Sequence, residues 1–159
     1  MAGVERFLKA QDGGEFEAAL AEITSGQKIG HWIWYVFPQL AGLGISQMSK
    51  LYGIRDRAEA VTYLRDSILR SRLEALTAAA AIQIRRGVSV KQLMGSAIDA
   101  RKFVSSLTLF DAIARDLIAG GDEGVATFAS DADDILDAAQ AEGYPRCGFT
   151  IQRLGAAPP

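Results

Sequence analysis

The sequence predicts an all-α fold, a single compact domain of about seven to nine helices, several of them short. Apolar residues recur at the three-and-four spacing of an amphipathic helix in 15–25, 68–86 and 98–119. Side chains that favour helix N-caps precede several segments, and glycines stand where segments end, because glycine readily adopts the left-handed backbone that closes a helix. A chain of 159 residues, 49% of them hydrophobic, is long enough for one core and rarely for two. We expect one domain over 1–154 and a disordered tail over 155–159.

The expected helices carry start and stop signals. Ser46, Asp56 and Ser67 are the expected N-caps of the fourth, fifth and sixth helices. Basic residues close the sixth helix just before Gly87, where they suit the negative end of the helix dipole. The expected helices cover 6–11, 15–25, 31–36, 47–52, 57–65, 68–86, 89–94, 98–119 and 131–141, and a short segment over 149–154 packs last.

The helix over 98–119 carries a carboxylate on its apolar face. At one hundred degrees per residue, Asp111 falls inside the expected buried arc. A charged carboxylate in an apolar setting must be ion-paired, hydrogen-bonded or shifted in pKa, unless it lies at the rim of the arc. The other members of this arc are Phe103, Val104, Leu107, Phe110, Ala114, Leu117 and Ile118.

Acidic residues dominate the chain from Asp122 to Glu142, which holds seven acids and no base. Asp131, Asp133 and Asp134 crowd the expected start of the ninth helix. Acids in a first turn stabilise a helix through its dipole, so this explanation is favoured over a cation site. We therefore predict no metal site here.

The composition speaks against several classes of protein. The N-terminus carries charges where a secretory signal needs an apolar stretch, and no apolar run approaches the roughly eighteen residues of a membrane span. We expect a cytoplasmic protein that does not enter a membrane. Cys147 is the only cysteine and His31 the only histidine, so the chain has no intramolecular disulfide and no ligand set for a structural zinc.

Charge is unevenly distributed along the chain. Residues 50–102 hold eleven Lys and Arg against five acids, whereas residues 103–159 hold three against nine. The basic segment could face nucleic acid, but acids interrupt it and its charges recur on several expected helices. We predict a solvated, ion-paired surface and no nucleic-acid binding.

The chain is organised around 26–46, where the lone histidine and both tryptophans fall within four positions. Four of the thirteen aromatic residues lie between His31 and Phe37. Such a cluster is either a core nucleus or a pocket wall, and a histidine among apolar residues can be a satisfied core group rather than a catalyst. Pro38 disfavours helix at Phe37, so we favour a short helix over 31–36 that stops there. An extended strand remains the alternative, because the spacing does not decide between them.

The order of several motifs resembles the bacterial domain-of-unknown-function family 1810 over about residues 4–154. The resemblance implies an all-α fold and brings no established activity. Two places depart from the family pattern: Ala97-Ile98-Asp99, where members often have Pro-Asp, and Cys147, near a position where an acid is common. The matching motifs are Arg6-Phe-Leu-Lys-Ala-Gln11, Gly26 to Lys28, His31-Trp-Ile-Trp34, Phe37-Pro-Gln39, Gly42-Leu-Gly44, Ser46, Tyr52, Tyr63-Leu64, Arg72-Leu73, Lys102, Ser105-Ser106 and Thr108-Leu-Phe110.

The preferred functional hypothesis is a pocket that binds a small anionic or nucleotide-like ligand. Aromatic rings would stack the ligand, Lys102 with nearby hydroxyls would hold an anion, and His31 is the candidate general acid or base. This hypothesis requires His31 and Lys102 to share a cavity. The expected ligand-binding residues are Trp32, Trp34, Tyr35, Gln39, Lys102, Ser105 and Ser106.

The alternative is a protein-interaction or scaffold module that presents the same aromatic stretch to a partner, since Trp and Tyr are also typical of interface hot spots. An open apolar patch around Trp32 and Trp34 would favour it, and a closed cleft with polar tips would favour the ligand pocket. The sequence identifies no cofactor and leaves enzyme activity open, because it contains no phosphate-cradling loop or nucleophile elbow.

Overall fold

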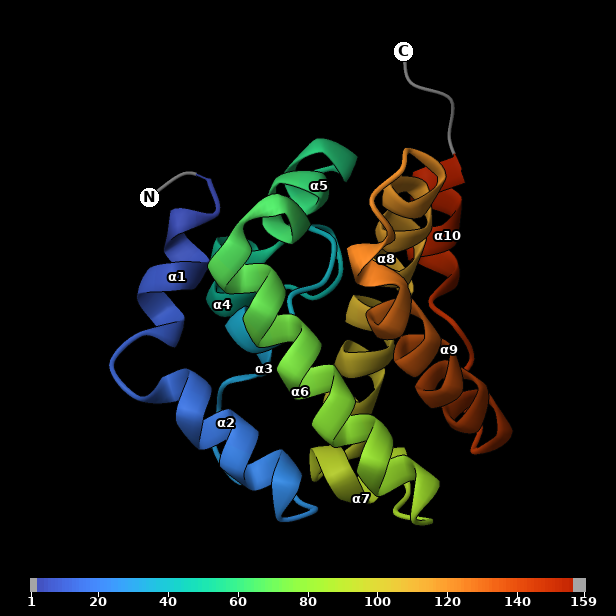
Figure 1. Ribbon diagram of the computed structural model, residues 1–159. Helices are drawn as coiled ribbons and strands as arrows, with labels where there is room; N and C mark the ends of the chain where they lie inside the picture. Colours follow the sequence, from blue (N-terminus) through green and yellow to red (C-terminus); the bar gives the residue numbers. More distant parts are fainter. Residues whose placement is uncertain (1–2, 156–159) are drawn as a thin grey trace.

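The protein is all-helical, as predicted. The computed structural model describes residues 3–155 and folds this range into ten α-helices and one 3₁₀ helix (Figure 1). Its backbone contains no extended strand in that range, only an isolated bridge between Leu40 and Ile54. The elements are α1 (Glu5–Gln11), α2 (Glu15–Thr24), α3 (Ile33–Val36), α4 (Gln47–Tyr52), α5 (Arg57–Arg65), α6 (Ser67–Arg85), α7 (Val90–Met94), α8 (Ala97–Ala119), η1 (Glu123–Val125), α9 (Ala126–Ala141) and α10 (Gly148–Gly155).

Two long helices organise the packing. Figure 1 shows α6 crossing the front of the molecule, with α1 and α2 on one side and α9 and α10 on the other. Helix α6 contacts α2, α5 and α9, and α8 contacts α3, α5, α7, α9 and α10. No helix in the described range is long and apolar enough to cross a membrane.

Helix α8 forms because its apolar residues share one face and its ends are capped. The Ser96 hydroxyl accepts a hydrogen bond from the Asp99 backbone N–H at the N-terminus, and the helix ends at Gly120. The predicted arc from Phe103 to Leu117 is buried, and Ile118 at its margin is half-buried. Burial of this arc against α9 and α5 makes α8 the centre of the hydrophobic core.

Two predicted caps are confirmed and one differs. The Ser46 and Asp56 side chains cap α4 and α5 as expected. The N-cap of α6 is Asp66, not Ser67, because the Asp66 carboxylate accepts from two backbone N–H groups of the first turn. Gly155 closes α10, and the rest of the predicted tail, residues 156–159, lies outside the described residues.

The expected start of the ninth helix at Asp131 is wrong. Helix α9 begins at Ala126, after the 3₁₀ turn η1, and its first turn contains no acid. The acids therefore do not act on the helix dipole. They form ion pairs with arginines from other elements: Asp131 and Asp134 with Arg85, and Asp133 with Arg115.

The connection from α3 to α4 is held by close backbone contacts. The Ile54 N–H donates to the Gln39 carbonyl at 2.9 Å, and the Ala41 N–H donates to the Ile54 carbonyl at 2.8 Å. Any Cβ at Gly53 would lie 2.8 Å from the Ala41 Cα, so only glycine fits there. This pairing holds the Gln39 backbone beside α4.

Candidate functional site

A small surface hollow lies where α3, α4 and α8 meet. Its volume is about 10 Å³. One water centre needs roughly that much space, so the hollow is narrow. Its lining combines apolar walls with polar tips from Ile33, Trp34, Phe37, Gln39, Met48, Ser49, Tyr52, Gly53 and Lys102.

One cationic and one aromatic side chain meet in this hollow. The Lys102 ammonium, from α8, lies 4.9 Å from the centroid of the Trp34 ring, from α3. Within residues 3–155 this ammonium forms no ion pair with a carboxylate. The Trp34 Nε1–H is buried and has no hydrogen-bond acceptor among the described residues. A buried donor without a partner costs roughly 1–3 kcal/mol, so the Trp34 N–H lacks an acceptor and the Lys102 ammonium lacks a counter-ion among the described residues.

Gln39 is the third expected residue in the hollow, and it is already engaged. Its side-chain amide Nε2 donates to the Leu43 carbonyl at 3.3 Å. This bond leaves the amide oxygen as an acceptor in the wall. Trp34, Gln39 and Lys102 are thus the predicted ligand-binding residues that the structure brings together.

Trp32 and Tyr35 do not line the hollow, although both lie beside it in sequence. Trp32 is 1% exposed, and its indole N–H donates to Glu22 at 2.9 Å. Burial alone would raise the pKa of Glu22, but this bond and the backbone N–H groups of Gly30 and Ile29 lower it. Trp32 therefore belongs to the core, where its polar tip is satisfied.

Tyr35 is also a core residue. It is 9% exposed, and its ring packs on Tyr52 with centroids 5.3 Å apart. Burial, with the nearby Glu15 carboxylate, raises the pKa of Tyr35 to about 12. Because the Tyr35 phenol stays neutral at ordinary pH, it packs in the core and can donate a hydrogen bond.

His31 does not meet the condition that the ligand hypothesis set for it. It is exposed, it precedes α3 because that helix starts at Ile33, and it does not line the hollow that contains Lys102. The predicted helix over 31–36 would have placed it on one face with Tyr35. The later start removes it from that face, so the geometry gives His31 no catalytic role in this hollow.

The two expected serines are separated by the turn of α8. Ser105 is buried and lines a second cavity, on the side of α8 that faces the start of α10. Ser106 is fully buried, and its hydroxyl has no hydrogen-bond partner within the described range. Neither serine lines the hollow with Lys102. The third hydroxyl, on Thr108, bonds back to the Val104 carbonyl at 2.7 Å, as expected for such residues inside a helix.

The predicted constraint on Asp111 is confirmed. Asp111 is 7% exposed, and its nearest cation, the Arg115 Nε, lies 3.4 Å from Oδ1. Burial, together with the Asp133 carboxyl opposite it on α9, raises the pKa of Asp111 to about 7, and Arg115 opposes this rise. Arg115 also pairs with Asp133, as does Arg146 at 3.6 Å. The two carboxyls and two arginines tie α8 to α9.

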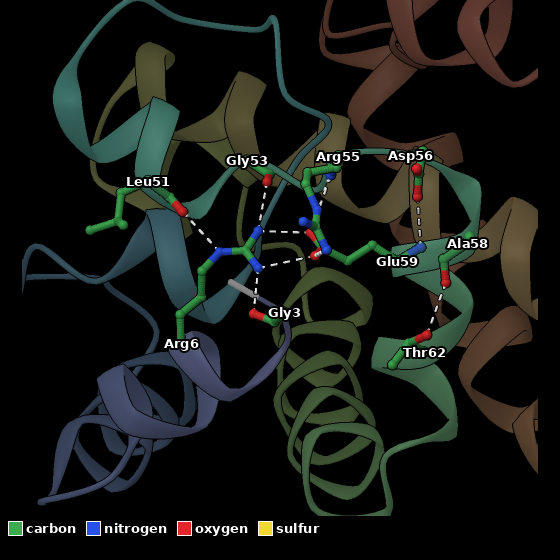
Figure 2. Close-up of polar contacts among 9 residues, drawn as sticks. All are labelled: Gly3, Arg6, Leu51, Gly53, Arg55, Asp56, Ala58, Glu59 and Thr62. Carbon is green, nitrogen blue, oxygen red and sulfur yellow. Dashed lines mark hydrogen bonds and ion pairs between the residues drawn. The ribbon is translucent and has the colours of Figure 1, made fainter. Parts of the chain in front are cut away.

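A buried ion pair that sequence reasoning missed joins α1 to α5 (Figure 2). The Arg6 Nη2 donates to Glu59 Oε1 at 2.7 Å and to the Gly53 carbonyl at 2.8 Å, while its Nε donates to the Leu51 carbonyl at 2.8 Å. Burial would raise the pKa of Glu59, but the hydrogen bond and charge of Arg6 lower it. Every group here is satisfied by protein, so the pair is structural.

The arginines of the basic segment are largely ion-paired, in agreement with the expected salt-bridged surface. The ion pairs that these arginines form with other parts of the chain are Arg57 with Asp116, Arg70 with Asp122, Arg72 with Asp12 and Arg85 with Asp131 and Asp134.

Among residues 3–155, no group of three or more His, Cys, Asp or Glu side chains is arranged to hold a metal ion.

The fold and the hollow define a single-domain, all-helical protein with a cation beside an indole ring in a narrow surface recess. The chain belongs to the family described as Protein of unknown function (DUF1810), whose family model matches residues 1–132. The crystal structure of the conserved hypothetical protein Rv1873 from Mycobacterium tuberculosis is similar, with a TM-score of 0.79 and 30% identity over 97% of both chains. Among curated proteins nothing matches. The family inferred from the order of the motifs is confirmed.

Proposed function

We propose that this protein binds a small organic anion in the hollow between α3, α4 and α8. One observation carries the proposal: the Lys102 ammonium lies 4.9 Å from the ring of Trp34, whose buried Nε1–H has no acceptor in the described range. A carboxylate or phosphate oxygen would accept from both groups, and such charge-assisted bonds are stronger than neutral ones.

The walls of the hollow indicate the rest of the ligand. Ile33, Phe37 and Met48 offer apolar surface, and Tyr52 adds a ring. Ligand pockets are typically about 300–1,000 Å³, and this hollow, at about 10 Å³, is far smaller. The volume therefore favours entry of an anionic group alone, with a small apolar or aromatic body lying across the mouth, over a whole nucleotide.

The scaffold alternative has less support. It needs an open apolar patch that includes both tryptophans, and Trp32 is 1% exposed. Trp34 alone is half-buried, and Lys102 lies over its ring. A single covered ring makes a poor hot spot for a protein partner.

Benzoate and phenyl phosphate are suitable probes, because each joins one small ring to one anionic group. Calorimetric titration should give measurable affinity for both, and none for benzylammonium, which has the same ring and the opposite charge. Lys102→Gln should weaken benzoate binding about fivefold or more, as loss of one close charge pair predicts. Lys91→Gln, an exposed lysine on α7, is the matched control and should leave the affinity unchanged.

Two results would contradict the proposal. Equal affinity for benzoate and benzylammonium would show that charge does not select the ligand. Equal benzoate affinity in the Lys102 and Lys91 variants would show that the anion binds elsewhere.

A further inference from the structure

The hollow between α3, α4 and α8 has an acceptor besides its two donors, the side-chain amide oxygen of Gln39. The Gln39 Nε2 donates to the Leu43 carbonyl at 3.3 Å. This bond fixes the orientation of the amide, because a carbonyl can only accept and therefore needs the nitrogen of the amide. The nitrogen is thus committed to the connection that leads to α4, and the oxygen is left free to accept.

The Gln39 amide oxygen is unused and reachable. Within residues 3–155 no group donates a hydrogen bond to it, and it keeps contact with solvent, whereas the Trp34 Nε1 is fully buried. This difference in burial sets the Trp34 donor deeper in the hollow than the Gln39 acceptor.

The main chain holds Gln39 in position. Its carbonyl accepts from the Ile54 N–H at 2.9 Å, and Leu43, which binds the side-chain amide, donates from its own N–H to the Leu40 carbonyl at 3.4 Å. A side chain that is anchored at its backbone and at its tip loses little freedom when a ligand binds, so little of the energy of a new hydrogen bond is offset by ordering.

The three polar groups indicate what a ligand must carry. The Lys102 ammonium and the Trp34 Nε1–H can only donate, so they bind the oxygens of an acid group. The Gln39 oxygen can only accept, so it needs a donor on the ligand. Because the hollow holds only about 10 Å³ and the acceptor lies nearer its mouth, this donor must stand on the atom next to the acid group.

The donor on the ligand must also be neutral and small. An ammonium in this position would be repelled by Lys102, whose charge no carboxylate of the described range offsets. An acylamino group would be neutral, but it adds several heavy atoms to a ligand that has little room. A hydroxyl adds one heavy atom and meets both conditions.

We propose that the ligand of this hollow is a small 2-hydroxy acid, whose carboxylate binds Lys102 and Trp34 and whose hydroxyl donates to the Gln39 amide oxygen. This assignment rests on the anion site proposed above and adds the class of the ligand. Gln39 is then the residue that separates 2-hydroxy acids from plain carboxylates, because a site built to hydrogen-bond a hydroxyl disfavours the analogue that lacks it.

Three ligands that share one skeleton test the assignment. Phenylacetate has only hydrogen on the carbon next to its carboxylate, mandelate has a hydroxyl there, and phenylglycine has an ammonium. In calorimetric titration of the native protein, mandelate should bind about fivefold more tightly than phenylacetate, as one partly exposed hydrogen bond predicts. Phenylglycine should bind more weakly than phenylacetate. Because the acceptor is fixed, the two enantiomers of mandelate should differ in affinity by about threefold or more.

Three variants test the part of Gln39. Gln39→Leu removes the acceptor at similar side-chain size, so it should make the affinities for mandelate and phenylacetate about equal and keep that for phenylacetate within about twofold of native. Gln92→Leu replaces an exposed glutamine on α7 and should leave the preference for mandelate unchanged. Tyr52→Phe removes the hydroxyl of another lining residue and should also retain the preference.

The outcomes separate this assignment from the anion site on which it rests. If neither phenylacetate nor mandelate binds the native protein, the anion site itself is wrong, and the assignment fails with it. If both bind with equal affinity, the anion site stands and the 2-hydroxy acid is wrong. A preference that survives Gln39→Leu or disappears in Tyr52→Phe would overturn the role of Gln39, as would loss of phenylacetate binding in Gln39→Leu.

Discussion

Asp111→Asn should stabilise the protein at neutral and alkaline pH. The carboxyl of Asp111 is buried between α8 and α9, and burial with Asp133 raises its pKa from 3.8 to about 7. Between these two values the folded protein holds a proton that the unfolded chain has released. The free energy of unfolding therefore falls as the pH rises from about 4 to about 7, and the full loss persists above that range.

The magnitude follows from the same two values. At roughly 1.4 kcal/mol for each tenfold change in proton affinity, the rise from 3.8 to about 7 corresponds to about 4 kcal/mol. This free energy is an upper limit, because Asp133 shares the proton and Arg115 offsets part of the charge. Asparagine cannot ionise, so the variant escapes the loss and gains over the native protein as the pH rises.

Urea unfolding, followed by circular dichroism between about pH 4 and pH 8, measures this effect as the difference between variant and native protein. Contributions from groups that the two proteins share cancel in the difference. Asp116→Asn, an exposed carboxylate on the same helix, is the matched control and should show little pH dependence in its difference. A difference for Asp111→Asn that stays constant with pH would refute the reasoning.

Two further substitutions, the first with a matched control, test the fold. Arg6→Ala strands the Glu59 carboxylate, whose side chain is 3% exposed, and should lower the free energy of unfolding by roughly 3–5 kcal/mol. Arg55→Ala removes a 60% exposed partner of the same carboxylate and should cost below about 1 kcal/mol, so equal losses in urea unfolding would argue against burial as the cause. Gly95→Ala should cost roughly 1–2 kcal/mol or more, because φ there is +84° and a Cβ would lie 3.0 Å from the Lys28 carbonyl oxygen. An unchanged melting temperature for this variant would contradict the backbone argument.

Local signals predicted the helices well, because their causes lie within a few residues. Pro38 ends α3 before a non-helical Phe37, with φ −123° and ψ 74°, and the Ser46 and Asp56 caps accept the backbone bonds expected of them. The helical pattern places Asp111 either inside the apolar arc or at its rim, and the structure shows it buried.

Other features depend on neighbours that are distant in sequence. Nothing in the local pattern shows that Asp131 meets Arg85 of α6, so the pattern predicts a helix start at these acids, whereas α9 begins at Ala126. The pair of Arg6 and Glu59 joins positions 53 residues apart and leaves no periodic trace.

In the candidate site, too, some features follow from the local sequence and others do not. The sequence predicts aromatic and cationic residues together, and Trp34 and Lys102 are in contact. It groups their neighbours in sequence with them, but a helix turns each successive side chain by about one hundred degrees. Ser105 therefore faces a different cavity from Lys102, whereas Trp32, which precedes α3, enters the core. The start of α3, which decides the place of His31, differs from the expected one by two residues.

The indole N–H resonance of Trp34 tests the proposed anion site most directly. The two indole resonances of the protein are distinguished by Trp32→Phe, and Trp32 serves as an internal control because its N–H is already bonded to Glu22. Titration with benzoate should shift the Trp34 resonance in a saturable way, leave that of Trp32 in place, and lose its effect in Lys102→Gln. A Trp34 resonance that does not move in the folded native protein, or that moves equally in the Lys102 variant, would contradict the account.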